Sequence, residues 1–261
     1  MLTVVSDLAP SAWIEAGKLP APGPGAPCLV GNCIPSGFEA YVKLLHPIYV
    51  DPTIKDHATS WHSAEQRDTG APGILSTGTL VRESSYGRAK GERLRWEDLA
   101  NRYGLTFHAD VNDGSFTRYF SDRSWPRYLL GPDEGTLDPE TCRELAAVLA
   151  PATLSQSVFF YYAGLSVQGY EPRMYLGKLR DVMEFFEMNE DLLATPEYWW
   201  PESREWCVCT DWDLSFTLIG GSEETIRTIS RSPILETLTV TPNSRVDWHA
   251  DEVNKGLGNQ I

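Results

Sequence analysis

Two aspartates, Asp211 and Asp213, lie two positions apart within residues 206–219, where apolar and polar residues alternate. Such alternation is typical of a β-strand, in which side chains at i and i+2 project from the same face. Neighbouring carboxylates on one face share a proton or a cation when that face lines a cleft, as in a hydrolase or a metal-assisted enzyme. A solvated outer strand face explains the same pattern. The residues predict one long strand and leave both interpretations open.

A catalytic base for such an enzyme would be His46, His57 or His62. None of these histidines is accompanied by a G-x-S-x-G nucleophile motif, a P-loop or a dinucleotide-binding glycine fingerprint. The sequence therefore nominates no catalytic triad. It leaves enzymatic activity open and favours a protein that is not an enzyme.

The cysteines and histidines do not form a recognisable metal site. Cys28 and Cys33 are five positions apart, and so are His57 and His62, whereas structural zinc sites use tighter pairs. The number of cysteines, five, is odd, which argues against a full disulfide framework. We predict reduced, buried or half-buried thiols in a reducing cytosol, with no metal and no cofactor.

Acidic and aromatic residues are concentrated between Asp181 and Ser215. This window contains ten acidic residues and one basic residue, Arg204, and so carries a net charge of −9 out of −14 for the chain. Aromatic anchors beside a rim of one charge are typical of specific protein interfaces. A core role for the tryptophans, with a solvated acidic face, is the alternative. The predicted partner-binding residues are Glu197, Tyr198, Trp199, Trp200, Glu202 and Glu205.

Composition narrows the class of protein. The 261 residues are 42% hydrophobic and 22% charged, close to the averages of globular proteins. The first residues show no basic leader, and no run of about 18 apolar residues occurs, so we predict a soluble cytoplasmic protein without membrane insertion. A net charge of −14 without a basic stripe predicts no direct contact with nucleic acid.

The order of predicted elements indicates the fold. Asp138 and Ser222 are suited to the N-caps of two helices, which should end before Pro151 and Pro233. Strands are predicted over residues 38–49, 158–167, 206–219 and 235–241, and further helices over 94–103 and 179–188.

Because strands and helices alternate irregularly, we expect an α+β fold with a mostly antiparallel or mixed sheet and packed helices. A single compact domain over residues 1–261 is predicted. It would include a loop or arm rich in proline and glycine at 19–27 and a long loop, a candidate lid, at 51–78.

Three stretches carry a resemblance to a known family. They are the segment 196–214 leading to Gly220-Gly221-Ser222, the segment 34–41 with His46-Pro47, and the segment 131–137. Together they resemble a family of proteins of unknown function found mainly in actinobacteria. The resemblance implies a bacterial cytosolic protein and no particular chemistry.

Three functions follow from these observations. The leading hypothesis is a non-enzymatic acidic interaction module with a basic protein partner, most concretely an immunity protein that neutralises a basic toxin. The first alternative is a hydrolase-like or metal-assisted enzyme that uses Asp211, Asp213 and a histidine. The second is a structural scaffold protein whose tryptophans fill the core.

Overall fold

The chain divides into two compact units. The computed structural model describes residues 1–55, 59–61, 91–117, 124–165, 167, 169–188, 192 and 195–256. One unit contains residues 1–46 and 134–247, and the other contains residues 47–133 and 248–261. Most of the predicted loop at 51–78, with His57 and His62, lies outside the described residues. The single-domain organisation stays a prediction.

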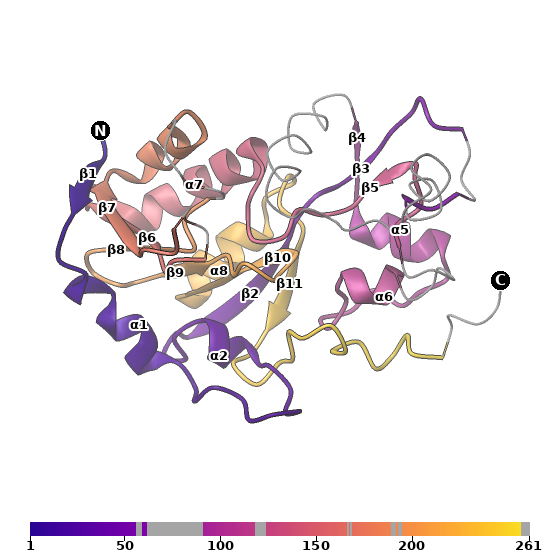
Figure 1. Cartoon of the computed structure of the whole chain (residues 1–261), viewed down its shortest axis with the longest axis horizontal. Helices are drawn as coiled ribbons and strands as arrows, with labels where there is room; N and C mark the ends of the chain where they lie inside the picture. The colour runs from indigo at the N-terminus through magenta and orange to yellow at the C-terminus, as the bar shows by residue number, and fades with distance from the viewer. Residues whose placement is uncertain are drawn as a thin grey trace. The chain divides into compact units, whose positions relative to one another are not determined.

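The first unit is built on an eight-stranded antiparallel sheet with the strand order β1-β7-β6-β8-β9-β10-β2-β11 (Figure 1). The predicted α+β class with a mostly antiparallel sheet is therefore confirmed. The strands are β1 (Thr3–Val5), β2 (Ala40–Leu45), β6 (Val158–Tyr162), β7 (Arg173–Gly177), β8 (Tyr198–Pro201), β9 (Cys207–Cys209), β10 (Phe216–Gly221) and β11 (Thr237–Val240).

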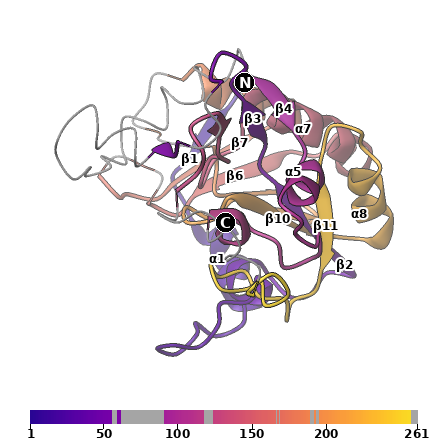
Figure 2. The same cartoon turned by 90° about the vertical axis from the view of Figure 1, so that its right-hand side faces the viewer.

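Helices cover both faces of this sheet. On one face, α7 (Pro139–Thr153), the 3-10 helix η3 (Leu179–Phe186) and α8 (Glu223–Ser230) enclose the main hydrophobic core, and α8 packs against β10, β2 and β11 (Figure 2). The other face carries η1 (Ala9–Ser11), α1 (Ala12–Gly17) and α2 (Val30–Cys33), as the ring contact of Trp13 with Trp200 shows. Strand β8 is consequently buried on both sides.

Local capping explains where the two longest α-helices of the described chain begin. The Asp138 carboxylate accepts hydrogen bonds from the backbone N–H groups of Glu140 and Thr141, at 3.0 and 3.1 Å. The Ser222 hydroxyl accepts one from the N–H of Thr225 at 3.2 Å. Both side chains satisfy donors that a helix N-terminus otherwise leaves without partners. The predicted starts of α7 and α8 are confirmed.

The predicted end of the first of these helices is wrong. Helix α7 continues through Pro151 to Thr153. The Thr153 hydroxyl donates to the carbonyl of Leu149, and the N–H of Leu154 donates to the carbonyl of Ala150. These bonds satisfy carbonyls of the last turn although Pro151 has no N–H to contribute.

The predicted strand at residues 206–219 is also wrong, because this stretch is a hairpin. Strands β9 and β10 pair with each other, with Cys209 opposite Leu218. Between them, the N–H of Leu214 donates to the Asp211 carbonyl at 3.1 Å, and the N–H of Asp213 donates to the Asp211 carboxylate at 3.2 Å. An aspartate that accepts from the backbone two residues ahead favours a turn. Asp211 and Asp213 therefore lie in a turn and not on a strand face.

The described residues of the second unit form a three-stranded antiparallel sheet and two short helices. The strand order is β4-β3-β5. The predicted strand at 38–49 is interrupted at His46 and Pro47, so that β3 belongs to this second sheet. Trp96 and Phe116 pack edge to face at 5.4 Å in the core of the unit. The elements are β3 (Ile48–Val50), β4 (Glu92–Leu94), α5 (Trp96–Arg102), α6 (Asp113–Thr117) and β5 (Leu129–Leu130).

Candidate functional site

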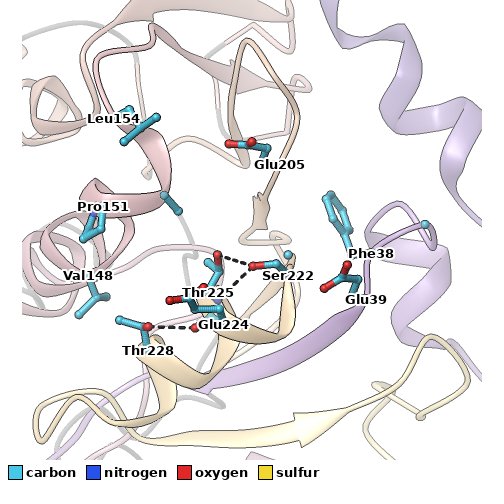
Figure 3. A pocket seen from close by; sticks show the side chains of 13 residues that line it. Phe38, Glu39, Val148, Pro151, Leu154, Glu205, Ser222, Glu224, Thr225 and Thr228 are labelled. Carbon is cyan, nitrogen blue, oxygen red and sulfur yellow. Dashed lines mark hydrogen bonds between the residues drawn. The ribbon is translucent and has the colours of Figure 1, made fainter.

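An open groove in the first unit lies at the N-terminal end of α8 and has a volume of about 540 Å³ (Figure 3). Four separate segments border it: residues 37–39 before β2, the last turns of α7, Glu205 in the loop between β8 and β9, and the first turns of α8. We call it the α8 groove. Its walls come from parts of the chain more than a hundred residues apart, which only the folded sheet brings together.

The α8 groove has an acidic rim. Glu39, Glu205 and Glu224 line it and are exposed, and no lysine or arginine is among the lining residues that the structure describes. The Glu39 carboxylate accepts a hydrogen bond from the backbone N–H of Glu223 at 3.2 Å. Since like charges gathered at one site repel each other, a bound cationic group would lower the electrostatic free energy of the rim.

One wall of the groove is apolar. Val148, Pro151 and Leu154 line it, and Leu154 has 79% of its surface exposed, while Phe38 lies on the opposite side of the groove beside Glu39 (Figure 3). Lysine and arginine side chains carry an aliphatic stem that packs on apolar surface while the charged end stays near water or a carboxylate. An apolar wall beside three carboxylates therefore has the surface chemistry that suits a basic side chain.

Leu154 lines the groove in a strained backbone conformation. Its φ and ψ angles are 55° and −129° at the C-cap of α7, in a region that residues with a side chain rarely adopt. Such a conformation costs about 1 to 3 kcal/mol and tends to persist at binding or catalytic sites. The conformation ends α7 and leaves the leucine side chain exposed beside the groove.

Two of the backbone donors at the start of α8 already have partners. The N–H of Glu223 bonds to Glu39, and the N–H of Thr225 bonds to Ser222. The first turn of the helix also carries the two negative charges of Glu223 and Glu224. An anion at this helix end would meet carboxylates in place of free donors, so the groove favours cations.

The predicted aromatic anchors are buried, which corrects the prediction that they form a surface. Tyr198, Trp199 and Trp200 are 2%, 0% and 1% exposed in β8. Trp200 stacks on Phe159 at 5.4 Å and meets Trp13 edge to face at 5.9 Å. These rings contribute to the core because β8 is covered on both faces, and they present no surface for a partner.

The predicted acidic residues are divided between the interior and the surface. Glu202 and Glu205 are exposed, and Glu205 lines the α8 groove. Glu197 is only 8% exposed, and its carboxylate accepts from the backbone N–H of Ala163 at 3.2 Å. Burial, followed by the nearby charge of Asp211, raises the pKa of Glu197 to about 7. Its predicted place on an exposed interface is therefore corrected.

The residues of the predicted enzyme site have different environments. Asp213 is exposed, whereas Asp211 is half-buried and has a pKa that burial raises. His46 has no solvent exposure, and its Nε2 atom lies 2.9 Å from the Thr217 hydroxyl, which in turn bonds to Thr210. This geometry is typical of a core histidine. His57 and His62 lie outside the described residues.

The second unit holds a polar cluster that the sequence did not suggest. The His108 Nε2 atom lies 3.0 Å from the carboxylate of Asp251, which is fully buried. Burial acts to raise the pKa of Asp251, but hydrogen bonds from Ser115, Asn254 and His108 outweigh it and leave the pKa lowered. The Asp251 carboxylate bonds to both the Ser115 hydroxyl and the His108 imidazole. In a Ser-His-Asp triad the imidazole lies between the hydroxyl and the carboxylate, so the order differs here. The cluster ties residues 251–254 to residues 106–115.

No group of three or more histidine, cysteine, aspartate or glutamate side chains suited to a metal ion occurs in the described part of the chain. No helix among the described residues is both long and apolar enough to span a membrane. Comparison of the chain with protein-family models, curated proteins and solved structures finds no match. The resemblance to the actinobacterial family stays a prediction.

Sequence reasoning identified Glu205 as a partner-binding residue but missed the rest of the α8 groove. The sequence alone assigns no partner-binding role to Glu39, Leu154 or Glu224. The one local signal was the pair Glu223-Glu224 directly after an N-cap serine. That signal does not reveal which other segments of the chain lie beside the helix.

Proposed function

We propose that this protein is an acidic interaction module that binds a basic segment of a partner protein in the α8 groove. The observation that carries the proposal is the pairing of three exposed carboxylates, Glu39, Glu205 and Glu224, with an apolar wall that includes the exposed Leu154. Together these features suit a lysine or arginine side chain better than a neutral or anionic ligand.

Electrostatics supports the proposal at longer range. The chain carries a net charge of −14, which accelerates encounter with a basic partner at low ionic strength. Arg204, the one basic residue between Asp181 and Ser215, lies over the Trp13 ring at 5.3 Å. That contact places the Arg204 guanidinium over an aromatic face.

In its most concrete form, the proposed module is an immunity protein of the bacterial cytoplasm that neutralises a basic toxin. The resemblance of residues 34–41, 131–137 and 196–214 to an actinobacterial family supports only the bacterial cytoplasm, and the acidic groove supports the basic partner. An acidic protein that occupies the basic substrate-binding surface of a toxin would block that surface and associate with it rapidly.

A structural scaffold is the second candidate function, and the burial of Trp199 and Trp200 favours it. Under this alternative the tryptophans only fill the core and the acidic groove has no specific partner. The enzyme alternative gains no such support, because His46 is buried against Thr217 while Asp213 is exposed.

Affinity capture tests the interaction against the scaffold. The tagged protein is incubated with a lysate of its native host at low salt, and bound proteins are eluted by rising salt and identified by mass spectrometry. We expect a basic protein in stoichiometric amount that elutes with salt, since charge pairing in an exposed groove is screened. Capture of no protein, or of proteins whose release is independent of salt, contradicts the proposal.

A further inference from the structure

Two cysteines that are five positions apart in the sequence lie close together at α2. The Sγ atoms of Cys28 and Cys33 are 3.9 Å apart, within hydrogen-bonding distance for sulfur. Cys28 is half-exposed, and Cys33 at the end of α2 is 7% exposed. The pair therefore combines one thiol that solvent reaches with a second thiol directly behind it.

The backbone around this pair is held at both ends. The Cys28 carbonyl accepts from the N–H of Val246 at 2.9 Å, and the Cys33 carbonyl accepts from the Tyr198 hydroxyl at 3.0 Å. Between them, the Asn32 side chain accepts from the N–H of Leu29 at 2.7 Å. A disulfide requires the two sulfur atoms to approach from 3.9 Å to about 2 Å.

We propose that Cys28 and Cys33 form a redox-active dithiol, which closes to an intramolecular disulfide by exchange with small-molecule disulfides such as oxidised glutathione. The site is independent of the α8 groove. The three other cysteines, Cys142, Cys207 and Cys209, have no solvent exposure and are protected from direct attack. Reactivity is therefore confined to the pair at α2.

The exchange proceeds in two steps. The Cys28 thiolate attacks one sulfur of the small disulfide, forms a mixed disulfide and releases one small thiolate. Cys33 then loses its proton and attacks the Cys28 sulfur, which displaces the second small thiol. Two thiols are oxidised to one disulfide, and one small disulfide is reduced to two thiols, so that atoms and electrons balance.

The electrostatics of the pair supports this order. The hydrogen bond from Cys33 is the main cause that lowers the pKa of Cys28, and the same bond raises the pKa of Cys33. The more exposed thiol is thus the one that ionises more easily. Thiolate character and exposure are the two properties that make a cysteine the attacking group.

Mass spectrometry of a tryptic peptide tests the proposal. Cleavage after Lys18 and Lys43 releases residues 19–43, which contain Cys28 and Cys33 and no other cysteine. After incubation of the intact protein with oxidised glutathione and alkylation, we expect this peptide to be unalkylated and lighter by two hydrogens. Dithiothreitol should restore two alkylated cysteines. A peptide that stays fully alkylated, or that carries only glutathione adducts, overturns the proposal.

Variants separate the two steps. Cys33→Ser should stop the reaction at a stable glutathione adduct on Cys28. Cys28→Ser, at the more exposed position, should abolish both the adduct and the loss of two hydrogens. Cys142→Ala serves as the matched control because it removes a buried thiol elsewhere and should react like the wild type. A glutathione adduct on Cys33 in Cys28→Ser that forms as readily as the adduct on Cys28 in Cys33→Ser would contradict the assignment.

Discussion

The carboxylate of Glu39 accepts a hydrogen bond from the backbone N–H of Glu223 at 3.2 Å, which joins the loop before β2 to the first turn of α8. This bond fixes one acidic side chain of the α8 groove on a helix that is itself capped by Ser222. Of the three rim residues, Glu224 belongs to α8, and this bond joins Glu39 to the same helix. A rim that is held in place before binding loses less conformational entropy when a partner arrives.

Neutralising two rim carboxylates should weaken binding of a basic partner. We expect Glu205→Gln with Glu224→Gln to lower affinity roughly twofold to thirtyfold at low salt, because exposed ion pairs contribute about 0.2 to 1 kcal/mol each. The salt dependence of binding should also fall. Isothermal titration calorimetry at several salt concentrations measures both quantities.

The matched control removes the same amount of charge elsewhere. Glu171 and Glu187 are exposed and do not line the groove. Glu171→Gln with Glu187→Gln should leave affinity close to that of the wild type. Equal weakening by the two double variants would show that net charge acts without a specific site.

Replacing Leu154 by glycine should separate stability from binding. Glycine adopts positive φ angles without strain, so Leu154→Gly should stabilise the fold by up to about 1 kcal/mol or leave it unchanged. The same change removes an exposed apolar side chain from the groove and should weaken partner binding. Chemical denaturation and calorimetry test the two effects. A variant that binds as tightly as the wild type would argue against a role for this wall.

The buried carboxyl of Glu197 should make stability depend on pH. Its pKa is about 7 in the folded protein and 4.5 in the unfolded reference, so the folded state holds the proton over the intervening range. Stability should fall as pH rises from about 5 to 7, by an amount on the order of 3 kcal/mol.

Glu197→Gln should flatten this pH profile. Glutamine resembles the protonated carboxyl and retains an oxygen that can accept from Ala163. Urea denaturation of both proteins between about pH 5 and pH 8 measures the difference in the free energy of unfolding. Glu205→Gln, a change to an exposed carboxylate, is the control and should keep the wild-type profile. Identical profiles for wild type and Glu197→Gln would refute the assignment.

Removal of the N-cap of α7 should destabilise the first unit. Asp138→Ala deletes the acceptor for the N–H groups of Glu140 and Thr141 and should cost about 1 to 2 kcal/mol. Asp138→Asn keeps a capping oxygen and should cost much less. Thermal unfolding monitored by circular dichroism compares the two variants, and equal losses would mean that the charge of Asp138, more than its cap, stabilises the helix.

The features that the sequence predicted well depend on local interactions. The caps at Asp138 and Ser222 act within three residues of the chain, so residue type and spacing identify them directly. The hairpin at residues 207–221 was missed because polar and apolar residues keep alternating through its turn. Only the hydrogen bonds from Asp213 and Leu214 to Asp211 distinguish the turn from a continuous strand.

The candidate site depends on contacts between distant segments, which one sequence does not report. Glu39, Leu154, Glu205 and Glu224 meet only because β2, α7 and α8 pack at one end of the sheet. The burial of Trp199 likewise follows from the position of β8 between β6 and β9. The acidic residues between Asp181 and Ser215 therefore indicate where the sequence is negatively charged, but they do not indicate which side chains remain exposed.

Nuclear magnetic resonance mapping with a capped arginine tripeptide tests the central claim most directly. The isotopically labelled protein is titrated with the peptide at low salt, and changes in backbone amide shifts are assigned to residues. We predict saturable changes centred on Phe38, Leu154, Glu205 and Glu224, which are lost in Glu205→Gln with Glu224→Gln. Shifts spread evenly over all exposed carboxylates, or none in the α8 groove, would contradict the claim that this groove is a site for basic side chains.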